Sequence, residues 1–158
     1  MTATKDTWTL DETLARVGAL TGIHVHVAGP ETGAPEVAWG DVFLYPAGAA
    51  APDNRFPVAT IVTGDYPGFD TASDLDRAGV YRLNIHVGRD RFRDLLGYGP
   101  EGHAARRDDH DYREQDRLLP HPVYAAQAWV SVVNPGPRCG ALAIDLIGEA
   151  RERNVRRG

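Results

Sequence analysis

Residues 80–87, Val-Tyr-Arg-Leu-Asn-Ile-His-Val, alternate between apolar and polar side chains. Successive side chains of a β-strand point to opposite faces of its sheet, so this period of two predicts a strand with one buried face. The side chains expected to face the helices are Tyr81, Leu83, Ile85 and Val87. The side chains expected in a row on the opposite face are Arg82, Asn84 and His86.

Four other segments have the composition and spacing of strands. They are residues 23–27, 36–45, 56–63 and 123–133. Residues 65–79 lie between two of these strands and have no period, which indicates a long acidic loop. The sequence therefore predicts a sheet of four to five strands.

Helical spacing is clearest at the two ends of the chain. Thr9 stands three residues before Glu12, the spacing of a capping box, and apolar residues then recur at helical intervals from Leu10. An amphipathic helix is expected to follow Arg138, a short one to occupy residues 89–96, and a helical turn residues 112–119. Strands joined mostly by loops, with helices at the N- and C-terminal ends, favour an α+β fold with a mainly antiparallel sheet.

Composition excludes several classes of function. The 158 residues suit a single domain, with residues 1–8 as a disordered tail. Seventeen basic against 22 acidic residues give a net charge of −5, which disfavours a nucleic-acid partner. No stretch reaches the roughly 20 apolar residues of a membrane span, and no secretory signal is evident, so the expected location is the cytoplasm without a membrane partner. The only lysine is Lys5, which leaves little scope for Schiff-base chemistry.

The motifs for cofactors and metals are weak. Residues 97–102 match G-x-G-x-x-G, but they follow a helix and contain a proline, so we expect no dinucleotide and no other cofactor. His24 and His26 share one face of a strand, yet two ligands do not make a metal site, and no bound metal is predicted. Cys139 near the start of a helix is more typical of core packing than of a reactive thiol.

The best candidates for a site come from three segments. They are the polar face of residues 80–87, a second strand with Trp39 and Asp41, and the proline-flanked loop with His121 and Tyr124. Pro120 and Pro122 restrict the backbone on both sides of His121, which aims its side chain at little entropic cost. If these segments converge on the polar face of residues 80–87, a cleft with an aromatic wall results. The predicted ligand-binding residues are Trp39, Arg82, Asn84, His86, Tyr124 and Trp129, and the predicted catalytic residues are His121 and Asp41. A solvent-exposed strand surface and a rigid loop without function remain the alternative interpretation.

Several segments together resemble a known family. They are Ala38-Trp-Gly-Asp41, Arg55-Phe-Pro-Val-Ala-Thr-Ile-Val-Thr63, Asp65-Tyr-Pro-Gly-Phe-Asp70, Arg82-Leu-Asn-Ile85 and Leu119-Pro-His-Pro-Val-Tyr124. This set resembles an actinobacterial domain-of-unknown-function family (number 6194) over residues 33–147, and the resemblance implies no activity. A weaker similarity is to YjbR-like small α+β domains, which would imply binding to DNA by fold analogy only.

Three functions remain open at this level. The first is a domain that binds a small ligand or a protein partner and has no chemistry of its own. The second is a cofactor-independent acid–base enzyme for a small natural-product intermediate, as in secondary metabolism. The third is a YjbR-type nucleic-acid binder, which the charge disfavours.

Overall fold

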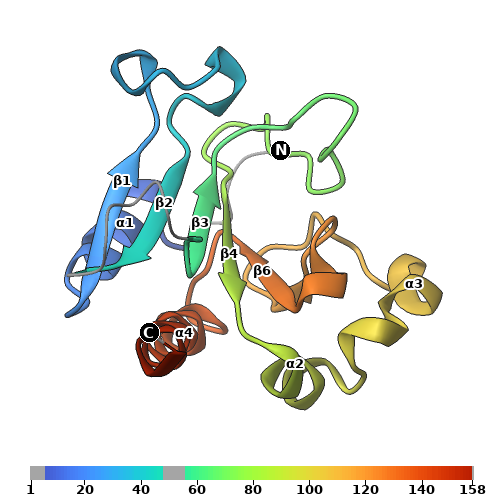
Figure 1. Ribbon diagram of the computed structural model, residues 1–158. Helices are drawn as coiled ribbons and strands as arrows, with labels where there is room; N and C mark the ends of the chain where they lie inside the picture. Colours follow the sequence, from blue (N-terminus) through green and yellow to red (C-terminus); the bar gives the residue numbers. More distant parts are fainter. Residues whose placement is uncertain (1–5, 48–55, 158) are drawn as a thin grey trace.

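The computed structural model describes residues 6–47 and 56–157, and within them six β-strands form one sheet in the order β1-β2-β3-β4-β6-β5 (Figure 1). The strands span Ile23–Val27 (β1), Val42–Pro46 (β2), Ala59–Val62 (β3), Arg82–His86 (β4), Leu119–Pro120 (β5) and Trp129–Val133 (β6). Each neighbouring pair is antiparallel. The predicted α+β class and antiparallel sheet are confirmed.

Four α-helices are present in the described residues, and capping residues mark the start of the first and the end of the second. They are α1 (Leu10–Gly18), α2 (Arg89–Leu96), α3 (His103–Arg106) and α4 (Gly140–Arg157). Thr9 and Glu12 form the predicted capping box at the start of α1. Gly97 ends α2 in the left-handed conformation, with φ of 83°, which an L-residue with a side chain adopts at a cost. Short 3-10 turns fill the connections, at Pro30–Thr32, Glu36–Ala38 (η2), Pro100–Gly102, Arg107–Asp109 and Ala125–Gln127 (η6).

One face of the sheet packs against α1 and α4. Val17 of α1 and Leu146 and Ile147 of α4 belong to the same buried cluster as the apolar residues of the central strands. Tyr81, Leu83, Ile85 and Val87 are all members of this cluster, as their alternation predicts. Burial of these side chains against the helices provides the main apolar core.

The opposite face of the sheet carries the polar side chains of the central strands, and Phe43 lies beside them. Strand register aligns Phe43 with Thr60, Thr60 with Asn84, and Asn84 with Ser131. These residues form a row across β2, β3, β4 and β6, on the side away from the helices. The loop of residues 63–79 reaches this face through Asp70 and the segment of residues 119–128 through His121, and both side chains contact Arg82.

The sheet has more strands than the sequence pattern predicts, and most of them are shorter than predicted. The sheet has six strands rather than four to five, because Leu119–Pro120 pairs with β6 at the edge, where a proline without an N–H is tolerated. The expected helical turn at residues 112–119 is wrong, since Leu119 belongs to this strand and the residues before it form turns and bends. Expected strands 36–45 and 123–133 begin later, at Val42 and Trp129, because η2 and η6 precede them.

The N-terminal segment contacts the rest of the chain through Trp8. Residues 1–5 of the expected tail lie outside the described residues. The Trp8 N–H donates to the Pro135 carbonyl at 2.7 Å, and the Arg16 guanidinium lies 4.1 Å from the centre of the Trp8 ring. Trp8 therefore packs between α1 and the start of α4, near Gly140.

Candidate functional site

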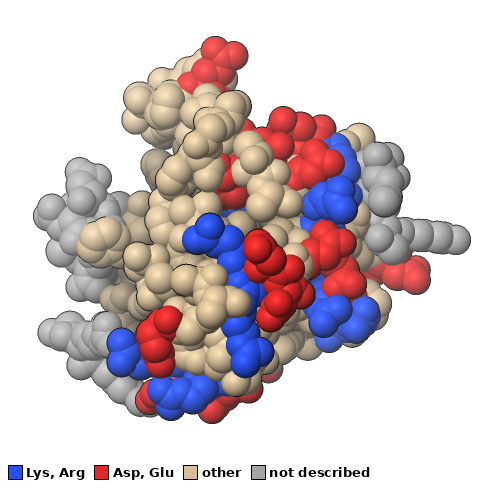
Figure 2. All heavy atoms as spheres, turned by 90° about the vertical axis from the view of Figure 1, so that its right-hand side faces the viewer, with Lys and Arg blue, Asp and Glu red and all other residues tan. Residues whose placement is uncertain are grey.

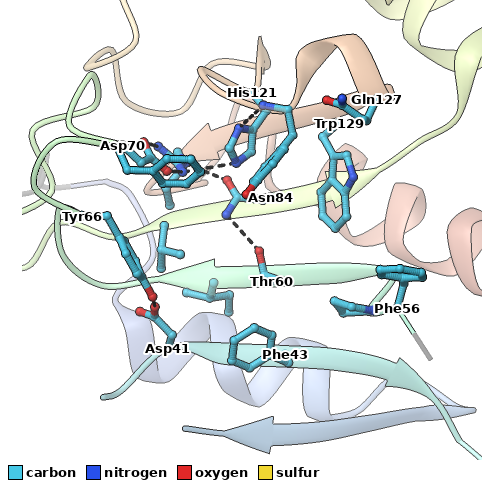
Figure 3. A pocket seen from close by; sticks show the side chains of 16 residues that line it. Asp41, Phe43, Phe56, Thr60, Tyr66, Asp70, Asn84, His121, Gln127 and Trp129 are labelled. Carbon is cyan, nitrogen blue, oxygen red and sulfur yellow. Dashed lines mark hydrogen bonds and ion pairs between the residues drawn. The ribbon is translucent and has the colours of Figure 1, made fainter. Parts of the chain in front are cut away.

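A cavity of about 490 Å³ lies on the face of the sheet away from α1 and α4 (Figure 3). Its floor is the row formed by Phe43, Thr60 and Asn84. Its walls include five aromatic side chains, namely Phe56, Tyr66, Phe69, Tyr124 and Trp129. Ligand sites in proteins typically combine such apolar walls with a few oriented polar groups.

The polar end of the cavity is built around Arg82, whose side chain is fully buried. Its guanidinium forms a two-point ion pair with Asp70, with Nη1–Oδ1 at 3.1 Å and Nη2–Oδ2 at 2.6 Å. Nε donates to Asn84 Oδ1 at 2.7 Å, and Nη1 also donates to Ser73 Oγ at 3.0 Å. Because a charge away from water is costly unless it is paired and hydrogen-bonded, this network explains how a cation can lie in a central strand.

His121 is held in place by the backbone that follows it. Its Nδ1 accepts hydrogen bonds from the backbone N–H groups of Val123 and Tyr124, at 3.0 and 2.9 Å. Its Nε2 lies 3.3 Å from Arg82 Nη2. Burial, and then the neighbouring Arg82 cation, lower the pKa of His121 to about 3, so the imidazole is neutral at physiological pH.

Asp41 and Tyr66 form a second polar pair at the cavity wall (Figure 3). The Tyr66 hydroxyl donates a short hydrogen bond to Asp41 Oδ2, while the Thr63 N–H and hydroxyl donate to Oδ1 at 3.0 and 3.3 Å. Burial raises the pKa of Asp41, and the bonds from Tyr66 and Thr63 oppose that effect. Burial and the Asp41 carboxylate raise the pKa of Tyr66, so its hydroxyl stays protonated and remains the donor.

The floor of the cavity is itself hydrogen-bonded. Asn84 Nδ2 donates to Thr60 Oγ1 at 3.0 Å, across the β3–β4 pair, while Asn84 Oδ1 accepts from Arg82. Cross-strand polar pairs of this kind fix both side chains in one orientation. The floor and the polar end therefore form one connected network from Thr60 to His121.

Six of the residues proposed from the sequence line this cavity. They are Asp41, Arg82, Asn84, His121, Tyr124 and Trp129. His121 thus lies against the polar face of β4, where its imidazole contacts Arg82. That face is buried, however, because Asp70 and the 63–79 loop cover Arg82 and Asn84.

Two proposed residues lie elsewhere. Trp39 follows η2 rather than lying on a strand, is 43% exposed, and donates from Nε1 to the Ala34 carbonyl. The left-handed Gly40, with φ of 91°, separates it from Asp41 and turns the chain between them. His86, at the end of β4, is held by Arg153 of α4, which donates to the His86 carbonyl at 2.6 Å. Neither residue lines the cavity, although the His86 ring lies 5.5 Å from the ring of Trp129, and their role in ligand binding stays a prediction.

Sequence reasoning missed Tyr66, Phe69, Asp70 and Thr60. The segment Asp65-Tyr-Pro-Gly-Phe-Asp70 lies in the long acidic loop, whose sequence has no period that predicts which side chains turn inward. One signal was present, since an arginine on a strand of otherwise apolar neighbours requires a carboxylate partner. The 63–79 loop, which leads into β4, supplies that partner in Asp70.

No group of three or more His, Cys, Asp and Glu residues among the described residues could hold a metal ion. His24 lies exposed on β1, and the His26 ring lies near Phe43 at a centroid distance of 6.3 Å. The prediction that the protein carries no metal therefore stays a prediction. Residues 97–102 connect α2 to α3 and contain a 3-10 turn in place of the strand-to-helix turn of a dinucleotide fingerprint.

The fold and the cavity define an α+β protein with a six-stranded antiparallel sheet, two helices on one face and an aromatic cavity on the other. The chain belongs to a family of unknown function, DUF6194, whose model matches residues 8–158. This confirms the resemblance to that family and extends it beyond residues 33–147 to α1 and the rest of α4. No curated protein and no solved structure matches the chain. In the described part of the chain, no helix is both long and apolar enough to cross a membrane.

Proposed function

We propose that the protein binds a small, mainly apolar organic molecule in the cavity on the face of its sheet away from α1 and α4. The observation that carries this proposal is the joint presence of aromatic walls and a buried hydrogen-bonding cluster in one cavity of about 490 Å³. Pockets of roughly 300–1,000 Å³ with this combination are the usual sites of small ligands. The proposal requires no cofactor.

The rigidity of the polar groups supports binding. Arg82 is fixed by four hydrogen bonds to three neighbouring side chains, Asp70, Ser73 and Asn84. His121 is fixed by two backbone N–H groups and lies between Pro120 and Pro122. Groups already in place lose little conformational entropy when a ligand binds, so more of the contact energy contributes to affinity.

The proposal is tested by screening small aromatic fragments against ¹⁵N-labelled protein. We expect bound fragments to shift the backbone amide resonances of Thr60, Asn84, His121 and residues 123–129. The Trp129→Ala variant removes one aromatic wall and should weaken binding at least about tenfold, since buried aromatic side chains dominate such contacts. Trp39→Ala is the matched control, because Trp39 lies outside the cavity, and it should leave affinity unchanged. Fragments that bind only elsewhere, or that bind Trp129→Ala as tightly, would contradict the proposal.

A second candidate function, an acid–base enzyme for a small natural-product intermediate, is favoured by the Asp41–Tyr66 pair. Burial raises the pKa of Asp41, hydrogen bonds from Tyr66 and Thr63 oppose that effect, and the carboxylate lines the cavity as a candidate proton acceptor. In this version Asp41, rather than His121, accepts the proton, because a pKa of about 3 makes His121 a weak base. Incubating ketone fragments in D₂O tests it: deuterium should enter next to the carbonyl with the wild type and not with Asp41→Asn.

A further inference from the structure

The tautomer of His121 is determined by its backbone contacts. Nδ1 accepts N–H groups from Val123 and Tyr124, so it carries no proton. A neutral imidazole then carries its proton on Nε2, which makes Nε2 a donor. Among the described residues, the hydrogen-bonding neighbour of Nε2 is Arg82 Nη2, at 3.3 Å, and this nitrogen can only donate.

Among the residues that the structure describes, one N–H group of the Arg82 guanidinium has no acceptor. A guanidinium has five N–H donors. Within the described residues, Asn84 takes the Nε donor, Asp70 and Ser73 take the two Nη1 donors, and Asp70 takes one of the two Nη2 donors. The remaining Nη2 donor belongs to the nitrogen that faces His121 Nε2. Two N–H donors therefore face each other beside the cavity, and no described residue supplies an acceptor for them.

Buried donors without an acceptor are costly, so this position favours an oxygen atom. The charges nearby favour a neutral one. The Asp70 carboxylate already offsets the Arg82 charge through a two-point ion pair. The carboxylate of Asp41, with three hydrogen-bond donors around it, adds negative charge to the same cavity. An incoming carboxylate would meet that negative charge without an unpaired cation to balance it.

We infer that the polar group of the ligand is a neutral carbonyl oxygen that accepts hydrogen bonds from His121 Nε2 and Arg82 Nη2. A carbonyl oxygen has two lone pairs and accepts two donors at once. The aromatic walls then contact the apolar body of the same molecule, so the ligand class is an aromatic or aliphatic ketone, ester or amide. This inference rests on the proposed binding function and names the chemistry of its ligand.

The first test measures the free protein. Two-bond ¹H–¹⁵N correlation spectra of histidine-labelled protein identify the tautomer of each imidazole. For His121 we expect a neutral ring with its proton on Nε2 from pH 5 to pH 8. A proton on Nδ1, or a charged ring at pH 6, would overturn the inference whether or not the cavity binds a ligand.

The second test uses three probes with the same aromatic body: 2-acetylnaphthalene, 2-ethylnaphthalene and 2-naphthoate. We expect the ketone to bind about tenfold more tightly than the hydrocarbon, as one or two hydrogen bonds would give, and more tightly than the carboxylate. The His121→Asn variant keeps an acceptor atom at the position of Nδ1 but lacks the Nε2 donor. In this variant the ratio of the ketone and hydrocarbon affinities should fall towards one. In His121→Gln, whose amide can place a donor near the position of Nε2, part of the ratio should return.

The outcomes separate this inference from the proposed function. Equal affinities for the ketone and the hydrocarbon in the wild type would overturn the inference and leave the binding function standing. Tighter binding of the carboxylate would replace the neutral oxygen with an anion and also overturn it. Absence of binding by all three probes, with no shift of the cavity resonances, would contradict both.

Discussion

Burying the Arg82 guanidinium in a central strand sets the chemistry of the whole cavity. The cost of removing a cation from water is offset only by a close partner and complete hydrogen bonding, and Asp70, Ser73 and Asn84 provide both. One polar residue on β4 thus positions three other side chains. The same guanidinium lies against His121 and contributes to its low pKa.

The pKa of His121 makes the stability of the protein depend on pH. In the folded protein this pKa is about 3, below its ordinary value of 6.5, so the folded chain binds fewer protons than the unfolded chain at acidic pH. The stabilising contribution is complete above pH 6.5 and is lost as the pH falls towards 3. Between pH 6.5 and 5.0 we expect the free energy of unfolding to fall by roughly 2 kcal/mol on account of this residue, at about 1.4 kcal/mol per pH unit.

Urea unfolding at the two pH values, followed by circular dichroism, measures this effect. His121→Asn, which cannot titrate in this range, should show a smaller loss than the wild type. His24→Asn replaces an exposed histidine and should behave as the wild type does. An equal loss in the wild type and in His121→Asn would show that His121 is not the group responsible.

At the level of elements, the two helix ends predicted from local sequence are present in the structure. The capping box of α1 joins Thr9 and Glu12 in both directions, with the Glu12 N–H donating to Thr9 Oγ1 at 3.1 Å and the Thr9 N–H to Glu12 Oε1 at 2.9 Å. α2 spans Arg89–Leu96 and ends at Gly97, as expected. These signals depend on residues within one turn of each other, so distant segments do not alter them.

Removing the cap of α1 should therefore destabilise the protein by a predictable amount. Thr9→Ala deprives the first turn of a hydrogen-bond acceptor, and we expect the free energy of unfolding to fall by about 1 kcal/mol. Thr21→Ala is a suitable control, because Thr21 is exposed between α1 and β1. Thermal or urea unfolding of the two variants makes the comparison. If Thr9→Ala cost no more than Thr21→Ala, the capping box would not contribute to stability.

For the whole molecule, the distribution of charge bears on its partners. The net charge is −5, and on the face shown in Figure 2 the acidic and basic side chains lie interspersed. Several arginines are engaged in ion pairs with acidic residues, such as Arg91 with Glu149 and Arg117 with Glu114. A protein that binds DNA needs cations free to neutralise phosphates, and these features do not favour that use.

We therefore expect no binding to duplex DNA beyond ordinary non-specific affinity. At physiological salt this corresponds to a dissociation constant of about 10⁻⁴ to 10⁻⁶ M. Fluorescence anisotropy with labelled duplexes of mixed sequence measures it directly. Nanomolar binding at that salt concentration would restore the YjbR-type interpretation.

The sequence alone determined the class of fold, the helix ends and the two-sided pattern of β4, because each depends on contacts between residues a few positions apart. It also brought His121 and Arg82 together as candidates for one site. Only the tertiary structure decided that Asp70 and Tyr66, from a loop without any period, complete the cavity, and that Trp39 and His86 lie outside it. The pairing of Leu119–Pro120 with β6 and the lengths of β2 and β6 were also decided there. The physical reason is that burial, ion pairing and strand pairing depend on contacts between segments that are distant in the sequence. Local periodicity does not contain information about those contacts.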